Sequence, residues 1–284
     1  MIDTEKKAQL LVEALPYIQR FAGKIIVIKF GGSIMVDPEL RLAFAKDVAL
    51  LRYVGIYPII VHGGGKEISK WMKKVGKEAV FIDGLRFTDS ETMELTEMVL
   101  SGKISNQLVD QINQMGGQAL ALSGKSANLF TAEKIRSKKD KDLGFVGQIE
   151  SIDDALLHHL VTQGYIPVIS SIGRNEEGET LNLNADNVAF SMAAHLSAEK
   201  LIYLTDVDGL MIGGELQNRL PLEKATELME HPEVSGGMLP KLECSLRAIQ
   251  GGVNRVHIIN GSRAHATLLE LFTDQGIGTL IYND

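Results

Sequence analysis

Lysines beside glycine loops are the residues of this sequence best suited to chemistry. Lys29 is the penultimate residue of an apolar run, and Gly31 and Gly32 follow that run directly. An ammonium at the end of a buried strand is costly unless it meets an anion, and glycines bare backbone N–H groups that can form an anion-binding nest. The motif favours phosphate chemistry, although a lysine that extends to solvent from a strand end would give the same pattern.

Two further glycine loops precede expected helices. Residues 63–65 are three successive glycines after an apolar run that ends at His62, more than a simple turn needs. We interpret His62 as a structural hydrogen-bonding residue rather than a base. Downstream, glycines 236 and 237 precede Pro240, which we expect at the first helical position, and Lys241. A lysine in a first helical turn is favoured when it shares a phosphate with the helix N-terminus; an exposed lysine is the alternative.

Amide and carboxylate side chains gather where a short alternating segment meets an expected helix. Asn182 and Asn184 point to the same face by strand alternation, and Asp186 follows in the first helical turn. Asn184 is a good helix N-cap, so the group could be ordinary capping. A polar edge that faces a ligand is the other interpretation.

Charged groups also stand near two more loops. Thr205, Asp206 and Asp208 end an apolar run just before a glycine, which indicates either a turn or a loop beside a nucleotide. Arg86 stands in the apolar segment GLRFT, where its planar guanidinium suits bidentate binding of a carboxylate.

Common nucleotide-binding signatures are missing from the sequence. The nearest match to G-x-x-x-x-G-K-[ST] ends at Ser126 and has Ala119 where glycine is needed, and no G-x-G-x-x-G follows the first apolar run. The H-R-D and D-F-G motifs of protein kinases are absent as well. The sequence therefore argues against a Walker-type enzyme, a Rossmann enzyme and a protein kinase.

The composition is that of an ordinary globular protein with net negative charge. Of 284 residues, 45% are apolar and 23% are charged, and the formal net charge of −7 argues against a nucleic-acid binder. Cys244 is the only cysteine, so no intrachain disulfide can form, and we expect a packed residue in a reducing compartment. The start lacks an apolar leader and no stretch approaches a membrane span, so we expect a soluble cytoplasmic protein.

Apolar, β-branched runs alternate with amphipathic segments along the chain. The expected strands cover residues 24–30, 58–62, 119–122, 166–170, 201–205, 255–259 and 279–282. The expected helices cover residues 38–54, 90–101, 152–163, 185–196 and 239–250, and segments 129–133 and 145–149 are expected to form an antiparallel hairpin. This alternation predicts an α/β fold, a three-layer αβα sandwich with a mainly parallel central sheet.

Residues 1–22 precede this pattern as a separate helix. Its apolar face has no core of its own and must pack on the body or on another subunit, and Pro16 is expected to bend or break the helix. Residues 23–284 form the remaining unit. A polar, turn-rich segment at 173–179 predicts a soft boundary between an N-terminal lobe, about 23–175, and a C-terminal lobe, about 176–284.

Six motifs in one order resemble those of the amino acid kinase family, and within it the acetylglutamate kinases. The motifs are KFGG, VHGGG, GLRFT, NLNAD, LTDVDG and GGMLPK, and the resemblance covers about residues 24–284. It implies the αβα sandwich, with acetylglutamate in the N-terminal lobe and ATP with Mg²⁺ in the C-terminal lobe. The implied reaction moves the γ-phosphoryl group of ATP to the γ-carboxylate of N-acetyl-L-glutamate, giving N-acetyl-L-glutamyl 5-phosphate in the second step of arginine biosynthesis.

The resemblance also implies a role for each motif. Lys29 and Lys241 would stabilise the transferring phosphoryl group, and Asp186 would hold both lysines. Acetylglutamate would contact Gly64, Gly65, Arg86 and Asn182, with Arg86 on the α-carboxylate. The nucleotide would contact Gly31, Gly32, Thr205, Asp206 and Asp208, and no protein ligand is assigned to the metal. An acceptor carboxylate is already ionised at pH 7, so no general base is required, and catalysis would rest on positioning and cations.

Two alternatives stay open from the sequence. One is a kinase for an amino-modified aminoadipate in lysine biosynthesis, a substrate one methylene longer. The other is a catalytically silent amino-acid sensor of the same fold, against which the intact Lys29, Asp186 and Lys241 argue.

The resemblance extends to regulation. Arginine-sensitive members carry an N-terminal helix like residues 1–22, form hexamers through it, and share a C-terminal stretch like residues 265–279. This implies a homo-oligomer, built from dimers, that L-arginine inhibits near His265, Glu270 and Gly276. A regulatory signalling protein is a partner of some members, and the sequence does not decide whether it binds here. No nucleic-acid or membrane partner is expected.

Overall fold

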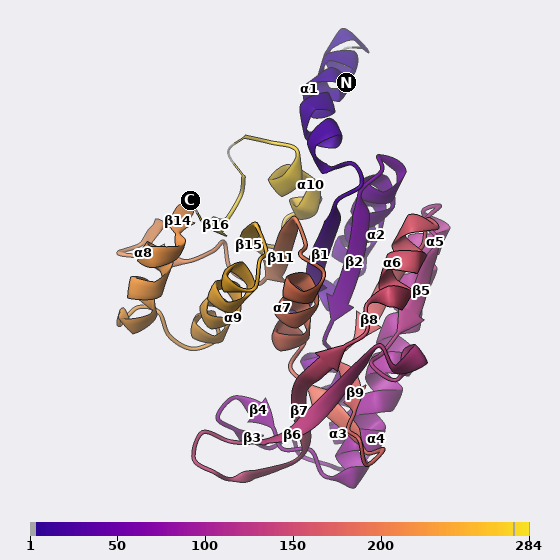
Figure 1. Ribbon diagram of the computed structural model, residues 1–284, viewed down its shortest axis with the longest axis vertical. Helices are drawn as coiled ribbons and strands as arrows, with labels where there is room; N and C mark the ends of the chain where they lie inside the picture. Colours follow the sequence, from indigo (N-terminus) through magenta and orange to yellow (C-terminus); the bar gives the residue numbers. More distant parts are fainter. Residues whose placement is uncertain (1–3, 275, 284) are drawn as a thin grey trace.

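The computed structural model describes residues 4–274 and 276–283, and an eight-stranded sheet forms its central layer (Figure 1). The strands are, in chain order, β1 (Ile25–Phe30), β2 (Tyr57–His62), β5 (Ala119–Leu122), β8 (Ile166–Ser170), β11 (Lys200–Thr205), β14 (Arg219–Pro221), β15 (Arg255–Asn260) and β16 (Thr279–Tyr282). Their spatial order is β14-β16-β15-β11-β1-β2-β8-β5, and only the β15–β16 pair is antiparallel. The predicted mainly parallel sheet is confirmed.

Helices cover both faces of the sheet. One face carries α6 (Ala155–Thr162), α7 (Ala185–His195), α8 (Leu222–Glu227) and α9 (Met238–Gln250). The other carries α2 (Pro38–Tyr53), α5 (Ser105–Gln114) and α10 (Ala266–Leu271). Strand β1 shows why the run is apolar throughout: Val27 packs into the first of these cores, whereas Ile26 and Ile28 pack into the second. The αβα sandwich is thus present as predicted.

A small closed barrel lies beyond the carboxyl ends of β1 and β2 (Figure 1). It is formed by β6 (Phe130–Arg136), β7 (Asp142–Ile152), β9 (Ile172–Arg174) and β10 (Thr180–Leu183). The predicted antiparallel hairpin is its β6–β7 pair, with longer strands than expected. The polar segment expected at the lobe boundary is the turn between β9 and β10, and the division into lobes stays a prediction.

Smaller elements complete the chain. They are α1 (Thr4–Phe21), η1 (Gly32–Met35), α3 (Gly65–Lys74), β3 (Phe81–Ile82), β4 (Leu85–Arg86), α4 (Ser90–Glu97), the π-helix η2 (Met98–Ile104), η3 (Ser126–Asn128), β12 (Met211–Ile212), β13 (Glu215–Leu216) and η4 (Leu228–Glu230). The helix expected to end at residue 101 therefore continues through η2 into α5. Within the described residues, no helix is long and apolar enough to cross a membrane.

Helix α1 is continuous through Pro16, so of the expected bend or break the break does not occur. Proline removes one backbone hydrogen bond, but Pro16 and Val12 lie on an exposed part of the helix, where water can satisfy the freed carbonyl. The apolar side chains of Leu11 and Leu15 are also exposed, at 75% and 47%. The helix extends away from the end of the sheet opposite the barrel (Figure 1).

The N-terminus of α7 is fixed by Asn184, as its sequence position suggested. The Asn184 side-chain oxygen accepts hydrogen bonds from the backbone N–H groups of Asp186 at 2.8 Å and Asn187 at 3.3 Å. The cap therefore sets where the helix begins and which way its first turn faces.

We expect Asn184→Ala to lower the free energy of unfolding by about 1 kcal/mol, the usual cost of losing an N-cap. Asn184→Ser, which keeps a capping oxygen, should retain most of that stability. Urea denaturation of both variants is the measurement. Equal stability of Asn184→Ala and the unmodified protein would show that the cap contributes nothing.

Candidate active site

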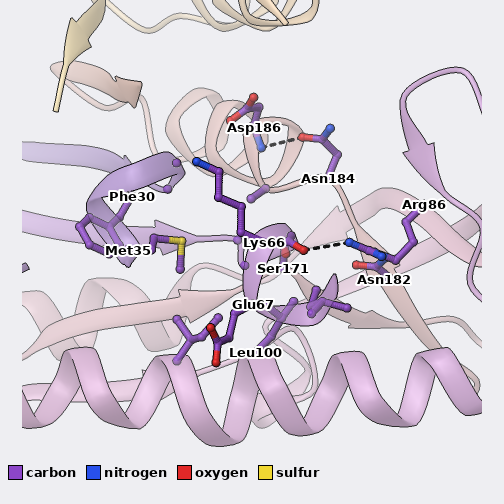
Figure 2. A pocket seen from close by; sticks show the side chains of 18 of the residues that line it. Phe30, Met35, Lys66, Glu67, Arg86, Leu100, Ser171, Asn182, Asn184 and Asp186 are labelled. Atoms are coloured by element: carbon purple, nitrogen blue, oxygen red, sulfur yellow. Dashed lines mark hydrogen bonds between the residues drawn. The ribbon is translucent and has the colours of Figure 1, made fainter. Parts of the chain in front are cut away.

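A cavity of about 520 Å³ opens at the carboxyl ends of β1 and β2 (Figure 2). Ligands of open α/β sheets bind at this edge. Its charged lining consists of six basic and two acidic side chains: Lys29, Arg41, Lys66, Lys70, Arg86, Lys103, Glu67 and Asp186. In a chain of net charge −7, this local excess of cations indicates an anionic ligand.

A second cavity of about 400 Å³ adjoins the first. Thr205, Asp206 and Lys241 line it, and Lys29 and Gly32 line both cavities. The end of β1 therefore separates two compartments, and the Lys29 ammonium is available to a group that passes between them.

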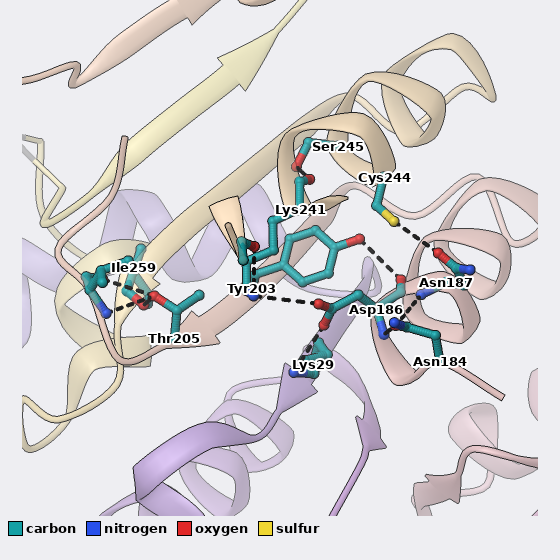
Figure 3. Close-up of polar contacts among 12 residues, drawn as sticks. Lys29, Asn184, Asp186, Asn187, Tyr203, Thr205, Lys241, Cys244, Ser245 and Ile259 are labelled. Carbon is teal, nitrogen blue, oxygen red and sulfur yellow. Dashed lines mark hydrogen bonds and ion pairs between the residues drawn. The ribbon is translucent and has the colours of Figure 1, made fainter. Parts of the chain in front are cut away.

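Asp186 joins the two expected catalytic lysines (Figure 3). Its carboxylate lies 2.9 Å from Lys29 Nζ and 3.6 Å from Lys241 Nζ, and its side chain is 13% exposed. Burial pushes the pKa of Asp186 upward, but the charges of Lys29 and Lys241 outweigh burial and hold the pKa below its usual value. The carboxylate is therefore ionised and keeps both ammonium groups in place.

Tyr203 supports this ion-pair group from the sheet, and sequence reasoning missed it. Its hydroxyl donates a 3.2 Å hydrogen bond to the backbone carbonyl of Asp186, and its ring is fully buried. Beside it, the buried Cys244 donates to the Asn187 side-chain oxygen at 3.1 Å. A polar aromatic residue inside an apolar strand was the available signal, because a buried hydroxyl needs a partner.

The glycine loop after β1 lies against the loop after β11. Gly32 has φ of +75°, a conformation that favours glycine, and a Cβ there would overlap the Asp206 carboxylate. The Thr205 hydroxyl is tied to the backbone of Val207 and Ile259. Gly32, Thr205 and Asp206 thus lie together where β1 and β11 end, and their role in nucleotide binding stays a prediction.

Asp208, the remaining site candidate in this segment, contacts a neighbouring loop residue instead of a cavity. Asp208 accepts a 2.9 Å hydrogen bond from the Asn260 side chain and does not line either cavity. Asp208 thus stabilises the loop that carries Asp206.

The glycine loop after β2 brings α3 against η2. A Cβ on Gly64 would lie 2.6 Å from Leu100 and would overlap Ile104, so only glycine permits this approach. A Cβ on Gly65 would have no neighbouring atom within 4 Å, so packing does not require glycine there. The Gly65 carbonyl accepts a 2.9 Å hydrogen bond from Arg86.

Arg86 is fixed in the wall of the larger cavity. Besides Gly65, it donates to Ser69 at 2.8 Å, and its guanidinium lies over the Phe81 ring at 4.8 Å. Asn182 lines the same cavity and donates to Thr88 (Figure 2). The four residues assigned to the acceptor therefore border one space.

His62 is placed as the sequence suggested, in a structural position. It is fully buried, and burial lowers its pKa to about 4. One ring nitrogen lies 2.7 Å from the Ser105 hydroxyl and the other 3.0 Å from the Gly63 carbonyl. A neutral, fully bonded imidazole is not available as a base.

A second buried charge cluster joins β11, β15 and α10. Glu270 contacts His257 Nδ1 at 2.5 Å, and Lys200 Nζ lies 3.0 Å from His257 Nε2. Gly276 is packed against the Glu270 carboxylate, which also accepts a hydrogen bond from the backbone of Ile277. Glu270 and Gly276 were singled out from the sequence, whereas Lys200 and His257 were missed because they sit inside apolar strands.

His265 faces a different partner from the other two residues of its motif. Its ring contacts the buried carboxylate of Asp47 on α2, whose pKa is raised to about 6 chiefly by burial. It therefore ties α10 to α2 and takes no part in the Glu270 cluster.

A metal would have few protein ligands in this site. Across residues 4–274 and 276–283, no group of three or more His, Cys, Asp or Glu side chains is arranged to hold an ion. Asp186 is occupied by two lysines. This donor set fits an ion that is carried by phosphate oxygens and water.

We expect Lys29→Met to raise the pKa of Asp186, because burial then acts against a single remaining cation. Carboxyl ¹³C NMR titration of the labelled protein measures the shift. Lys46→Met, at an exposed position on α2, should leave the Asp186 titration unchanged. An unaltered pKa in Lys29→Met would contradict the assigned charge balance.

Known proteins resemble this chain over nearly its whole length. The model of the amino acid kinase family matches residues 24–260. Acetylglutamate kinase from Caldanaerobacter subterraneus subsp. tengcongensis is 49% identical over 279 residues, covering 97% of this chain and 93% of the relative.

Solved structures agree with this relation. N-acetylglutamate synthase from Neisseria gonorrhoeae, complexed with coenzyme A and N-acetyl-glutamate, has a TM-score of 0.88 and 29% identity over 98% of this chain, which spans 63% of the synthase. The same synthase complexed with coenzyme A and L-arginine has a TM-score of 0.84 and 27% identity, covering 98% and 65%. With the family model and the near full-length relative, these likenesses establish that the chain belongs to the amino acid kinase family.

Proposed function

We propose that this chain transfers the γ-phosphoryl group of ATP to the γ-carboxylate of N-acetyl-L-glutamate, within arginine biosynthesis in the cytoplasm. The near full-length relative named acetylglutamate kinase supports this substrate pair. The observation that carries the proposal is the position of Lys29 and Gly32 in the lining of both cavities, so that two substrates can meet end to end there.

The charge inventory suits a reaction between two anions. N-acetyl-L-glutamate has two carboxylates, and six basic side chains line the larger cavity. Lys29 and Lys241 neutralise charge that develops on the transferring group, and Asp186 keeps them oriented. The acceptor is ionised at neutral pH. The reaction therefore requires no general base.

Binding of the two substrates is divided between the cavities. Arg86 and Asn182 take the acceptor's α-carboxylate end, and the Gly64 and Gly65 backbone lies toward its reacting end. The smaller cavity, with Thr205 and Asp206, receives the nucleotide. Mg²⁺ bound to the phosphates would neutralise charge on the nucleotide.

We expect a coupled ADP-release assay to give activity with N-acetyl-L-glutamate and much less with glutamate or acetylated aminoadipate. Arg86→Lys should raise KM for N-acetyl-L-glutamate about tenfold or more and leave KM for ATP nearly unchanged, because lysine lacks the bidentate fork.

Lys70→Arg, a second exchange between lysine and arginine in the lining of the same cavity, is the matched control and should change neither KM. A preference for acetylated aminoadipate would assign the chain to the alternative pathway, and no turnover with any acceptor would favour the sensor. If Arg86→Lys raises only the KM for ATP, Arg86 contributes to nucleotide binding rather than to acceptor binding.

The chain is further proposed to be regulated by L-arginine through an assembly of dimers. Glu270 offers a buried carboxylate suited to a guanidinium, and Gly276 is packed against that carboxylate. Helix α1 reaches this region, since Lys200 lies over the Phe21 ring at 4.9 Å and Tyr17 packs on Phe272. The related synthase complexed with L-arginine supports the choice of effector.

Helix α1 also offers a surface for assembly. Leu11, Val12 and Leu15 are exposed on it, and burying such side chains against a second subunit is favourable. An effector that binds where α1 meets the body can favour one subunit arrangement over another.

We expect L-arginine to inhibit the full-length enzyme and L-lysine not to do so. Glu270→Gln should abolish inhibition with kcat retained, and deletion of residues 1–22 should abolish both inhibition and the hexamer. Activity assays and light scattering are the measurements. If the full-length protein is a dimer and arginine does not change its reaction rate, the proposed regulation is wrong. The proposed kinase activity would not be affected by that result.

A further inference from the structure

Lys66 is a cation of the active site that has no part in the contacts assigned so far to the two substrates. It is the second residue of α3, directly after Gly65, and it lines the larger cavity. A lysine in the first turn of a helix is opposed by the helix dipole, which favours an anion there. Its position is thus unfavourable for the empty helix and favourable when an anion is bound nearby.

The Lys66 side chain reaches across the site to the nucleotide loop. Its Nζ lies 3.4 Å from the Asp206 carboxylate, and the two side chains are 61% and 45% exposed. An ion pair this exposed contributes little to stability. The fold therefore does not depend on this contact, and the lysine can exchange its partner at little cost.

The Lys66 and Lys29 ammonium groups both lie near the glycine turn that follows β1. The Asp206 carboxylate that Lys66 contacts packs on Gly32, and a Cβ on Gly31 would lie 2.7 Å from Lys29 Nζ. Figure 2 shows Lys66 directed away from Arg86 and toward the side of the cavity that carries Phe30 and Asp186. Its charge is therefore aimed at the junction of the two compartments rather than at the α-carboxylate end.

We propose that Lys66 is a positioning residue for the terminal phosphoryl group of the bound nucleoside triphosphate. Its ammonium pairs with Asp206 in the ligand-free protein and moves to the γ-phosphate oxygens when the triphosphate enters. The oxygens of a terminal phosphate carry more negative charge than a single carboxylate, so the exchange is favourable. This inference rests on the proposed kinase function, and it adds a contact that depends on the γ-phosphate.

The test compares binding of a non-hydrolysable ATP analogue with binding of ADP, each with Mg²⁺ and without acceptor, by titration calorimetry. Lys66→Met should weaken binding of the analogue about tenfold and binding of ADP less than twofold, because only the analogue carries the γ-phosphate that the ammonium contacts. Lys66→Arg should restore most of the difference. Lys73→Met, an exposed lysine in the last turn of α3, is the matched control and should change neither.

Steady-state kinetics supply the second readout. Lys66→Met should lower kcat while leaving KM for the acceptor within about twofold, because a contact with the γ-phosphate alone does not alter acceptor binding. If Lys66→Met weakens binding of the ATP analogue and of ADP equally, or weakens neither, the proposal is wrong. So does a higher acceptor KM with an unchanged nucleotide ratio, which would place Lys66 on the acceptor. The binding test needs no acceptor, so it stays decisive even if N-acetyl-L-glutamate is not the substrate.

Discussion

The buried carboxylate of Asp186 is the constraint on which the rest of the site depends. An ionised group in the protein interior must be paired, and removing one partner of such a group is strongly destabilising. Asp186 meets this requirement with Lys29 from the end of β1 and Lys241 from the first turns of α9. Three segments distant in the sequence are thereby held at one point. The two lysines that stabilise the carboxylate also line the cavities: Lys29 lines both, and Lys241 lines the smaller one.

The sheet order explains why this point lies between two compartments. β1 occupies the middle of the sheet, with β2 on one side and β11 on the other, and a glycine loop follows both β1 and β2. Close packing by itself requires these glycines. Gly32 permits contact with Asp206, and Gly64 permits α3 to approach η2. The proposed phosphate-binding role would require glycine at the same positions.

Periodicity predicted the architecture well, because the strands are apolar on both faces and the caps are local. The strands at 119–122, 166–170 and 279–282 have the expected bounds, and Asn184 caps α7. Pro240 lies at the third rather than the first position of α9, which is still in the first turn, where a backbone N–H has no partner within the helix. Pro16 does not interrupt α1, because it lies on an exposed part of the helix where water can satisfy the freed carbonyl. Contiguous motifs predicted residues that line the two cavities, whereas residues brought together only by tertiary contacts were missed. Lys200 and His257 looked like ordinary strand residues, and only the packing of Glu270 reveals a cluster. His265 is turned toward Asp47 by a left-handed backbone conformation, which no spacing rule anticipates.

The central place of β1 also bears on how the protein is made. β1 ends at Phe30, but its neighbour β11 starts only at Lys200, so one edge of an apolar strand stays unpaired while most of the chain is translated. Exposed strand edges promote association between chains, and pairings between distant segments form slowly. Nascent chains of this protein are thus most vulnerable to aggregation before β11 leaves the ribosome, the interval in which a chaperone would protect them.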